Sequence, residues 1–340
     1  MENRRGKGRE LQLAGEDGTN RKCQATQLDK MKTKAGFIPG HHEAEICNGG
    51  EANLPKRYTS CKKNPGHARF IPVNDFNLNH LPSRYHDVIM LEVIKALSAL
   101  TVLVKVNYTS QVRPRRTNLF IGQYPFYNTR GTDVLRTGTG RVYQVDKYTK
   151  SDNKGTCPCG KCQHSDTPSK VWGEVHVRTA THVVFDESEA RQTRCVVGFD
   201  DNKSPGVGLD GWKVRKADVD GDWCLFSCVS CDLELVDQLD KAYRNFDDLW
   251  EKVSEKYTQF VDVDKLTVIV SHPHGCPKKV SVGQWTQKHV RDDGWYKYMY
   301  TTCTCPGSSG ACVYMPGYVR WRHPHSGSNS EGNYSGNGWT

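Results

Sequence analysis

The strongest constraint on the fold is a series of short apolar runs that starts near Thr137 and continues almost to the C-terminus. Each run is rich in β-branched or aromatic residues and is followed by a cluster of Gly, Pro, Asn or Asp. Short strands separated by turn-forming residues are typical of all-β barrels and sandwiches. The runs are Arg141–Val145, Glu174–Thr179, Cys195–Phe199, Leu266–Ser271, Lys279–Val282, Trp295–Thr302 and Cys312–Tyr314. We therefore expect a mainly β domain.

Two segments have helical periodicity instead. Apolar residues at helical spacing predict a helix that follows an N-cap at Ser83, and Val102–Val106 then predicts a strand. A second apolar stripe predicts an amphipathic helix over residues 237–257, and we interpret the stripe as core packing. Its members are Leu239, Tyr243, Phe246, Trp250, Val253 and Tyr257.

Positive charge is concentrated at the N-terminus. Of the 47 Lys and Arg and the 38 Asp and Glu residues of the chain, 14 and 8 lie within residues 1–70. With only 36% hydrophobic residues overall, we expect residues 1–80 to form a basic, largely disordered arm. Such an arm fits either weak contact with nucleic acid or a solvated tail without a partner.

The remaining organisation follows from composition. We expect residues 81–131 to form a helix–strand extension and a connector, residues 132–328 the main domain, and the Ser/Gly/Asn-rich residues 329–340 a flexible tail. The N-terminus lacks the apolar core of a signal peptide, and the longest apolar run, Ala96–Val104, is too short to span a bilayer. We therefore expect an intracellular protein, cytoplasmic or nuclear, without a membrane partner.

Three segments combine the residue types that peptide hydrolysis needs. Amide hydrolysis requires a nucleophile, a base, a group that orients the base, and donors for the developing oxyanion. His182 ends an apolar run, Asp222 precedes the apolar run Trp223–Phe226, and Ser309 lies in a Gly-Ser-Ser-Gly turn. Each feature alone is common, but their order and context together favour a catalytic triad.

Residues 132–328 resemble the chymotrypsin-like (trypsin-like, PA-clan) serine peptidase superfamily. Thr179-Ala-Thr-His182 resembles the segment around the catalytic His of that family, and Gly138-Thr-Gly-Arg-Val resembles a strand that opens many of its barrels. Cys305-Pro-Gly-Ser-Ser-Gly-Ala resembles the segment around its catalytic Ser. The resemblance implies two six-stranded barrels with the active site between them, the helix at 237–257 in the connection, and a serine endopeptidase acting through an acyl-enzyme on a protein or peptide.

The resemblance also implies roles for individual residues. His182 would act as general base and then general acid, Asp222 would hold the imidazole tautomer, and Ser309 would attack the carbonyl. The backbone amides of Gly307 and Ser309 would form the oxyanion hole. Ser308 stands where secreted members carry an Asp, so the zymogen switch of secreted members is absent, as in intracellular and viral-type members.

Specificity is predicted from two further positions. Some relatives that cleave after Glu or Gln place a hydroxyl residue and a His where this chain has Thr304 and His325. These side chains could bind the carboxylate or carboxamide of the residue before the scissile bond, the P1 residue. The alternative is that His325 has no role in recognition.

Cysteine spacing suggests a structural metal site. Cys159 and Cys162 form one close pair and Cys228 and Cys231 another, which suits tetrahedral zinc, with Cys157 as a spare ligand. Reduced thiols and disulfides are the alternatives. Four protein ligands would leave no open position, so such zinc would not be catalytic.

Two other classes of function remain open at this point. The first is a catalytically inactive protease-fold module that keeps the barrels for binding. The second is a zinc-ribbon nucleic-acid-binding protein that uses the basic arm and the cysteine pairs, whose affinity would fall steeply with salt.

Overall fold

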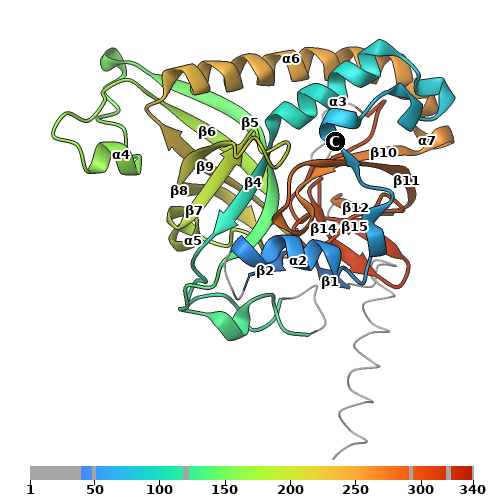
Figure 1. The fold of residues 1–340 in the computed structure, drawn as a ribbon, viewed down its shortest axis with the longest axis horizontal. Coiled ribbons are helices and arrows are strands. Elements are labelled where there is room, and N and C mark those ends of the chain that lie inside the picture. Colours follow the sequence, from blue (N-terminus) through green and yellow to red (C-terminus); the bar gives the residue numbers. More distant parts are fainter. Residues whose placement is uncertain (1–39, 48–50, 118–121, 291–293, 319–322, 339–340) are drawn as a thin grey trace, which may run out of the picture. The chain divides into compact units, whose positions relative to one another are not determined.

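The computed structural model describes residues 40–47, 51–117, 122–290, 294–318 and 323–338 of the 340-residue chain. All of them belong to one unit that runs from Pro39 to Thr340. Two β-sheets form its centre, and the two long helices lie along one side (Figure 1). Residues 1–39 of the expected basic arm are outside the described residues.

The first sheet is a closed six-stranded barrel. Its strands pair in the order β5, β4, β7, β8, β9 and β6, and pairing of β6 with β5 closes the ring. A short strand, β2 (Glu45–Ile46), adds to the outer edge of β5. The barrel strands are β4 (Thr101–Val106), β5 (Arg136–Tyr148), β6 (Trp172–Thr179), β7 (Thr193–Val197), β8 (Val207–Asp218) and β9 (Trp223–Ser230).

The second sheet curves in the same way. Its main path runs β1, β14, β15, β12, β11, β10 and β13, and β3 pairs with β11. An isolated bridge between Cys312 and Pro324 connects the β13 end of this path back to the segment that enters β14. Its strands are β1 (His41–His42), β3 (Ile71–Pro72), β10 (Leu266–Ser271), β11 (Lys279–Val290), β12 (Tyr296–Tyr300), β13 (Val313–Tyr314), β14 (His325–Asn329) and β15 (Gly332–Ser335).

Two long helices pack against each other and against the core (Figure 1). Asp87 caps α3 (Val88–Leu100) and Asp232 caps α6 (Leu233–Tyr257), each through its side chain. The short helices are α2 (Leu54–Thr59), α4 (Gly160–Gln163), α5 (Glu187–Arg191) and α7 (Val261–Asp264). Single 3-10 turns span Glu51–Asn53, Pro65–His67, Val73–Asp75, Leu78–His80, Ser83–Tyr85, Tyr127–Thr129, Lys150–Asp152, Thr258–Phe260 and Pro273–Gly275.

The architecture confirms the expected mainly β, two-barrel class with an inserted helix. The apolar stripe of α6 packs in the main hydrophobic core, with Tyr243 partly buried at its margin, which confirms its interpretation as packing. The predicted helix after Ser83 instead begins at Val88, because Asp87 supplies the cap and Ser83 belongs to a 3-10 turn.

Two expected boundaries differ from the structure. The extension at 81–131 is part of the first barrel, because β4 pairs on both sides within it. The tail expected to be flexible contributes to β14 and β15, and Tyr334 in it is fully buried. Residues 40–47 and 51–80 of the expected arm also carry strands and helices. Composition missed these segments because their buried apolar residues, such as Leu54, Phe70 and Tyr334, are few and stand among polar residues in the sequence.

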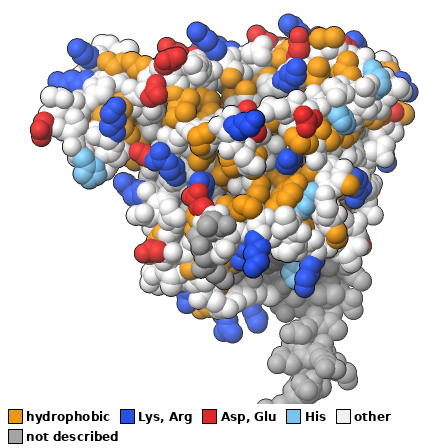
Figure 2. Space-filling model, viewed as in Figure 1, with side chains coloured by type: hydrophobic (Ala, Val, Ile, Leu, Met, Phe, Trp, Pro, Cys, Tyr) orange, Lys and Arg blue, Asp and Glu red, His pale blue; other side chains and the backbone are white. Residues whose placement is uncertain are grey.

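The surface charge is mixed on the one face that Figure 2 draws. On the face drawn in Figure 2, Lys and Arg side chains are interspersed with Asp and Glu and surround hydrophobic side chains. In the described part of the chain, no helix combines the length and the hydropathy that a membrane span requires.

Candidate active site

The three predicted catalytic side chains meet in one buried place. His182 lies in the turn after β6, Asp222 in the turn between β8 and β9, and Ser309 in the loop between β12 and β13. Nε2 of His182 is 2.7 Å from Oγ of Ser309. On the other side of the ring, Nδ1 lies 2.9 and 2.8 Å from the two carboxylate oxygens of Asp222. The structure thus brings together residues separated by as many as 127 positions.

The position of Asp222 is fixed by its surroundings. The backbone N–H of His182 donates to its Oδ1 at 3.0 Å, and the hydroxyl of Ser326 donates to its Oδ2. Burial would raise the pKa of Asp222, but the charges and hydrogen bonds of His182 and His42 outweigh burial and hold that pKa well below its usual range. Asp222 is therefore a carboxylate that orients the imidazole with Nδ1 protonated.

The imidazole is arranged to accept a proton. Burial lowers the pKa of His182 to about 4, against the opposing effect of Asp222, and the nearby charge of His42 lowers it further. The ring is therefore neutral at pH 7. With Nδ1–H directed at Asp222, the unprotonated Nε2 accepts the hydrogen bond of the Ser309 hydroxyl, which is the arrangement that general-base catalysis requires.

A buried ion cluster holds the turn that carries His182. Arg113 donates to the backbone carbonyl of His182 at 3.0 Å, and Arg136 donates to that of Val183 at 2.9 Å. Both guanidinium groups are paired with the carboxylate of Glu189, and all three side chains are at most 1% exposed. Sequence reasoning missed this cluster, because Arg113 and Glu189 lie in segments without a recognisable motif.

The backbone near Ser309 has the shape expected of an oxyanion hole. Gly307 has a φ of +94°, and a Cβ there would lie 2.6 Å from the carbonyl oxygen of His272. Thr139 fixes the loop, since its hydroxyl donates to the Gly307 carbonyl at 2.8 Å and its N–H donates to the Ser309 carbonyl at 2.7 Å. The amide N–H of Gly307 donates to the carbonyl oxygen of Glu43, whose own N–H is 3.1 Å from Oγ of Ser309, so this N–H lies close to the nucleophile.

The fold is chymotrypsin-like. A closed six-stranded barrel and a second curved sheet are joined through α6, and the His182–Asp222–Ser309 cluster draws its members from both halves. Ser308, which stands where secreted members carry an Asp, is buried, and its hydroxyl is hydrogen-bonded to that of Ser271 at 3.1 Å.

Comparisons with known proteins give structural neighbours only. No family model and no curated protein matches the sequence. Among solved structures, the chain is similar to the active form of the Rv3671c protease from M. tuberculosis, at 10% identity and a TM-score of 0.37, over 73% of this chain and 80% of that one. It is also similar to the HtrA-type protease AlgW with a tripeptide (9%, 0.36, 72% and 58%) and to the thermostable serine protease AL20 from an extremophilic microorganism (10%, 0.35, 72% and 92%). At these scores, the neighbours indicate nothing about the activity of this chain.

The two predicted specificity residues lie beside one acidic side chain. Nε2 of His325 is 2.8 Å from Oε2 of Glu43, and Nδ1 of His325 is 2.6 Å from the hydroxyl of Tyr300. The hydroxyl of Thr304 accepts a hydrogen bond from the ammonium of Lys63 at 3.1 Å. Lys63 is also paired with Glu43. The sequence did not reveal Glu43 or Lys63, because both lie in the segment that composition suggested was disordered.

The predicted zinc ligands separate into two places. Cys159, Cys162 and Cys231 come together with Cys157, and their sulfur atoms all lie within 4.8 Å of one another. Cys228 points into the barrel core, so the predicted set is corrected to one in which Cys157 replaces it. The reason is strand alternation: Cys228 lies within β9, whereas Cys231 follows the end of that strand. Zinc binding by this set, which we name the Cys157 cluster, stays a prediction.

Proposed function

We propose that the protein is a serine endopeptidase that cleaves peptide bonds after glutamate. The observation that carries the proposal is the hydrogen-bonded line from Asp222 through His182 to the Oγ of Ser309. A hydroxyl with a neutral imidazole at 2.7 Å and a carboxylate behind it is the arrangement by which serine acts as a nucleophile at neutral pH.

The reaction proceeds in two balanced steps. Ser309 Oγ attacks the carbonyl carbon while His182 Nε2 takes its proton, and the oxyanion accepts hydrogen bonds from the amides of Gly307 and Ser309. His182 then gives the proton to the leaving amine as the C–N bond breaks. Water, deprotonated by His182, hydrolyses the acyl-enzyme and restores the Ser309 hydroxyl.

The preference for glutamate follows from the pocket around His325. An imidazole N–H, the ammonium of Lys63 and the hydroxyl of Ser328, which lies 2.7 Å from Oε1 of Glu43, together complement a carboxylate. Of the two P1 residues that sequence reasoning left open, glutamate fits better, because only a carboxylate forms an ion pair with Lys63.

Peptide hydrolysis tests the proposal. Peptides that differ only in the P1 residue, which is Glu, Gln, Asp, Lys or Phe, are incubated with the full-length protein. They are also incubated with a Glu43→Lys variant, in which the Glu43 carboxylate no longer occupies the pocket. We expect cleavage after Glu to dominate and to disappear in Ser309→Ala, whereas Ser151→Ala, at an exposed serine, cleaves normally. Absence of cleavage in both proteins would favour the inactive binding module.

A further inference from the structure

Residues 41–46 cross the active site as an extended strand. His41 and His42 pair antiparallel with Ser328 and Gly327 of β14, in the second sheet. Three residues later, Glu45 and Ile46 pair antiparallel with β5 of the first barrel. The segment therefore passes from one half of the fold to the other, and Glu43 and Ala44 lie at the crossing.

The main chain of Glu43 occupies the position of a scissile carbonyl. Its carbonyl oxygen accepts a hydrogen bond from the N–H of Gly307 at 2.6 Å, which is one of the two donors assigned to the oxyanion hole. Its own N–H is 3.1 Å from Oγ of Ser309. The residue that places its carbonyl in the oxyanion hole next to the nucleophile is the residue whose following peptide bond is attacked.

The side chain of Glu43 fills the acidic-specificity pocket at the same time. The residue is 4% exposed, and its carboxylate is bonded to His325, Ser328 and Lys63. Burial would raise the pKa of Glu43, but the hydrogen bond and charge of His325 and the charge of Lys63 outweigh burial and hold that pKa well below its usual range. The carboxylate is thus ionised in the pocket.

The residue before Glu43 completes a substrate-like arrangement. The ring of His42 lies over that of His182, with the ring centroids 4.2 Å apart. On the opposite strand, a Cβ at Gly327 would lie 2.0 Å from the carbonyl oxygen of His41, so the close approach of the two backbones requires glycine there. The site accepts this backbone as an added strand, which is a general mode of peptide recognition.

We propose that this chain is its own substrate and that Ser309 cleaves the bond between Glu43 and Ala44 intramolecularly. The proposal rests on the proposed endopeptidase function. Ser309 Oγ bonds to the Glu43 carbonyl carbon, the C–N bond to Ala44 breaks, and His182 passes the serine proton to the new amine of Ala44. Water then releases the carboxylate of Glu43 and regenerates Ser309, which leaves residues 1–43 and residues 44–340.

Self-cleavage would also control access to the pocket. While the bond is intact, the segment is tethered in the site and competes with any other substrate at a high effective concentration. Release of residues 1–43 removes the side chain that fills the pocket, so other glutamate-containing peptides can enter.

Intact mass and N-terminal sequencing of the full-length protein test the proposal. We expect a chain that begins at Ala44 in the wild type and in Glu51→Gln, a nearby exposed glutamate outside the site. The bond should stay intact in Ser309→Ala and in Glu43→Lys. In cell-free synthesis, the rate of cleavage should not change over a hundredfold dilution, because the reaction is intramolecular.

Three outcomes would overturn the proposal. In the first, the Glu43–Ala44 bond stays intact in the wild type while Glu43→Lys hydrolyses Glu peptides. The segment would then be an inhibitor that blocks the site, and the proposed endopeptidase function would be retained. The second is cleavage that slows in proportion to dilution. The third is the absence of both self-cleavage and peptide hydrolysis in every variant, which would remove the proposed function as well.

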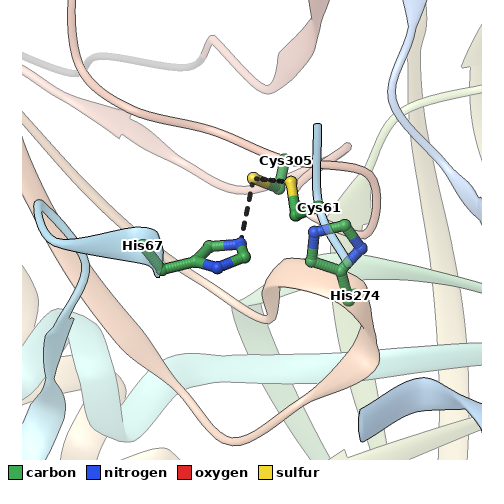
Figure 3. Close-up of side chains that lie close together, drawn as sticks. All are labelled: Cys61, His67, His274 and Cys305. Carbon is green, nitrogen blue, oxygen red and sulfur yellow. Dashed lines mark hydrogen bonds between the residues drawn. The ribbon is translucent and has the colours of Figure 1, made fainter. Parts of the chain in front are cut away.

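A second site is carried by a separate group of side chains close to the nucleophile loop. Cys61 follows α2, His67 and His274 lie in 3-10 turns, and Cys305 precedes Ser309 in its loop. The four side chains point towards one another (Figure 3), and their ligand atoms all lie within 4.8 Å of one another. Cys61 and Cys305 sulfurs are 3.5 Å apart, and Nε2 of His67 is 3.4 Å from the Cys305 sulfur.

These separations suit a tetrahedral zinc ion. With Zn–S bonds of about 2.3 Å and Zn–N bonds of about 2.0 Å, a tetrahedron places sulfur atoms about 3.8 Å apart and sulfur and nitrogen about 3.5 Å apart. Nδ1 of His274 is bonded to Glu45 at 2.7 Å, which leaves the buried Nε2 for a metal. A carboxylate on the far nitrogen is the usual support of a metal-binding histidine.

The sulfur atoms also receive hydrogen bonds as metal-bound thiolates do. The backbone N–H of Asn64 is 3.4 Å from Cys61 Sγ, and its side-chain amide is 3.1 Å from Cys305 Sγ. We infer that Cys61, His67, His274 and Cys305 bind a structural Zn²⁺, which ties the segment containing Lys63 to the loop containing Ser309. All four positions are protein ligands, so the ion has no open site for catalysis.

Metal analysis of the purified full-length protein tests this site, with the Cys157 cluster as a matched control. We expect Cys61→Ser to lose about one equivalent of zinc relative to the wild type, whether or not the Cys157 cluster also binds. In a Cys159→Ser background, added Co²⁺ should give the absorption of a tetrahedral ion with two thiolates, and His67→Ala should abolish it. Unchanged zinc in Cys61→Ser, or a Cys61–Cys305 disulfide in place of metal, would overturn the inference.

Discussion

Lys63→Met should lower activity on Glu peptides more than on Gln peptides, and so reduce the selectivity of the pocket. The ammonium of Lys63 pairs with the Glu43 carboxylate and is also held by Asn333 at 2.7 Å and by Thr304 at 3.1 Å. The side chain of Lys63 is 31% exposed, whereas that of Glu43 is 5% exposed. Removal of one partner of a buried hydrogen-bonded ion pair costs about 2–5 kcal/mol, and the exposure of Lys63 places this pair at the lower end.

A loss of about 2 kcal/mol corresponds to a roughly 30-fold fall in kcat/KM for a peptide with Glu before the scissile bond. In a matched Gln peptide the ammonium donates to an uncharged carbonyl oxygen, and loss of this hydrogen bond at a partly exposed lysine costs about 1 kcal/mol, or roughly fivefold. The Glu/Gln selectivity should therefore fall by about sixfold. The assay compares the two peptides at one pH, with Lys62→Met as the control at the adjacent lysine. Equal losses for both peptides, or no loss for Glu, would refute this account of the pocket.

Four other consequences follow from the site and the core. Asp222→Asn should lower kcat by roughly 10³–10⁴-fold with the fold intact, because the wrong tautomer is held; a loss below tenfold in steady-state kinetics would contradict its role. Since the pKa of His182 is lowered to about 4, the proton-accepting form persists below neutral pH, so self-cleavage should continue at pH 5 and be half-lost near pH 4; half-loss at pH 6.5 would contradict that shift. Glu189→Gln should lower the free energy of unfolding by about 3–5 kcal/mol in urea titration, because two buried guanidinium groups lose their counter-charge; a change under 1 kcal/mol would be inconsistent. Cys159→Ser should lose about one equivalent of zinc, while Cys195→Ser should lose none; equal contents in the two variants would exclude the Cys157 cluster.

The triad could be predicted from sequence because its signals are local. His182, Asp222 and Ser309 each lie at the end of a strand or in a glycine turn that periodicity reveals, and the family resemblance orders them. The structure adds what no local pattern contains, namely that Ser326 contacts Asp222 and that Thr139 fixes the loop of Ser309.

The occupant of the site could not be predicted in the same way. Residues 41–46 contain only two apolar residues, Ala44 and Ile46, and lie in a basic region, so composition indicated disorder. Their strands exist because two sheet edges offer backbone partners and because a pocket binds Glu43. Cys157 and Cys228 show a related limit, since spacing along the chain does not reveal which face of a strand a side chain occupies.

The most direct test of the central claim is the position of a fluorophosphonate adduct. The Glu43→Lys variant and the wild type are treated with the probe, digested, and mapped by mass spectrometry. We expect a single adduct at Ser309, which is lost in Ser309→Ala and forms much more slowly in His182→Ala. Failure of both proteins to react, or an adduct on any other residue that persists in Ser309→Ala, would contradict it.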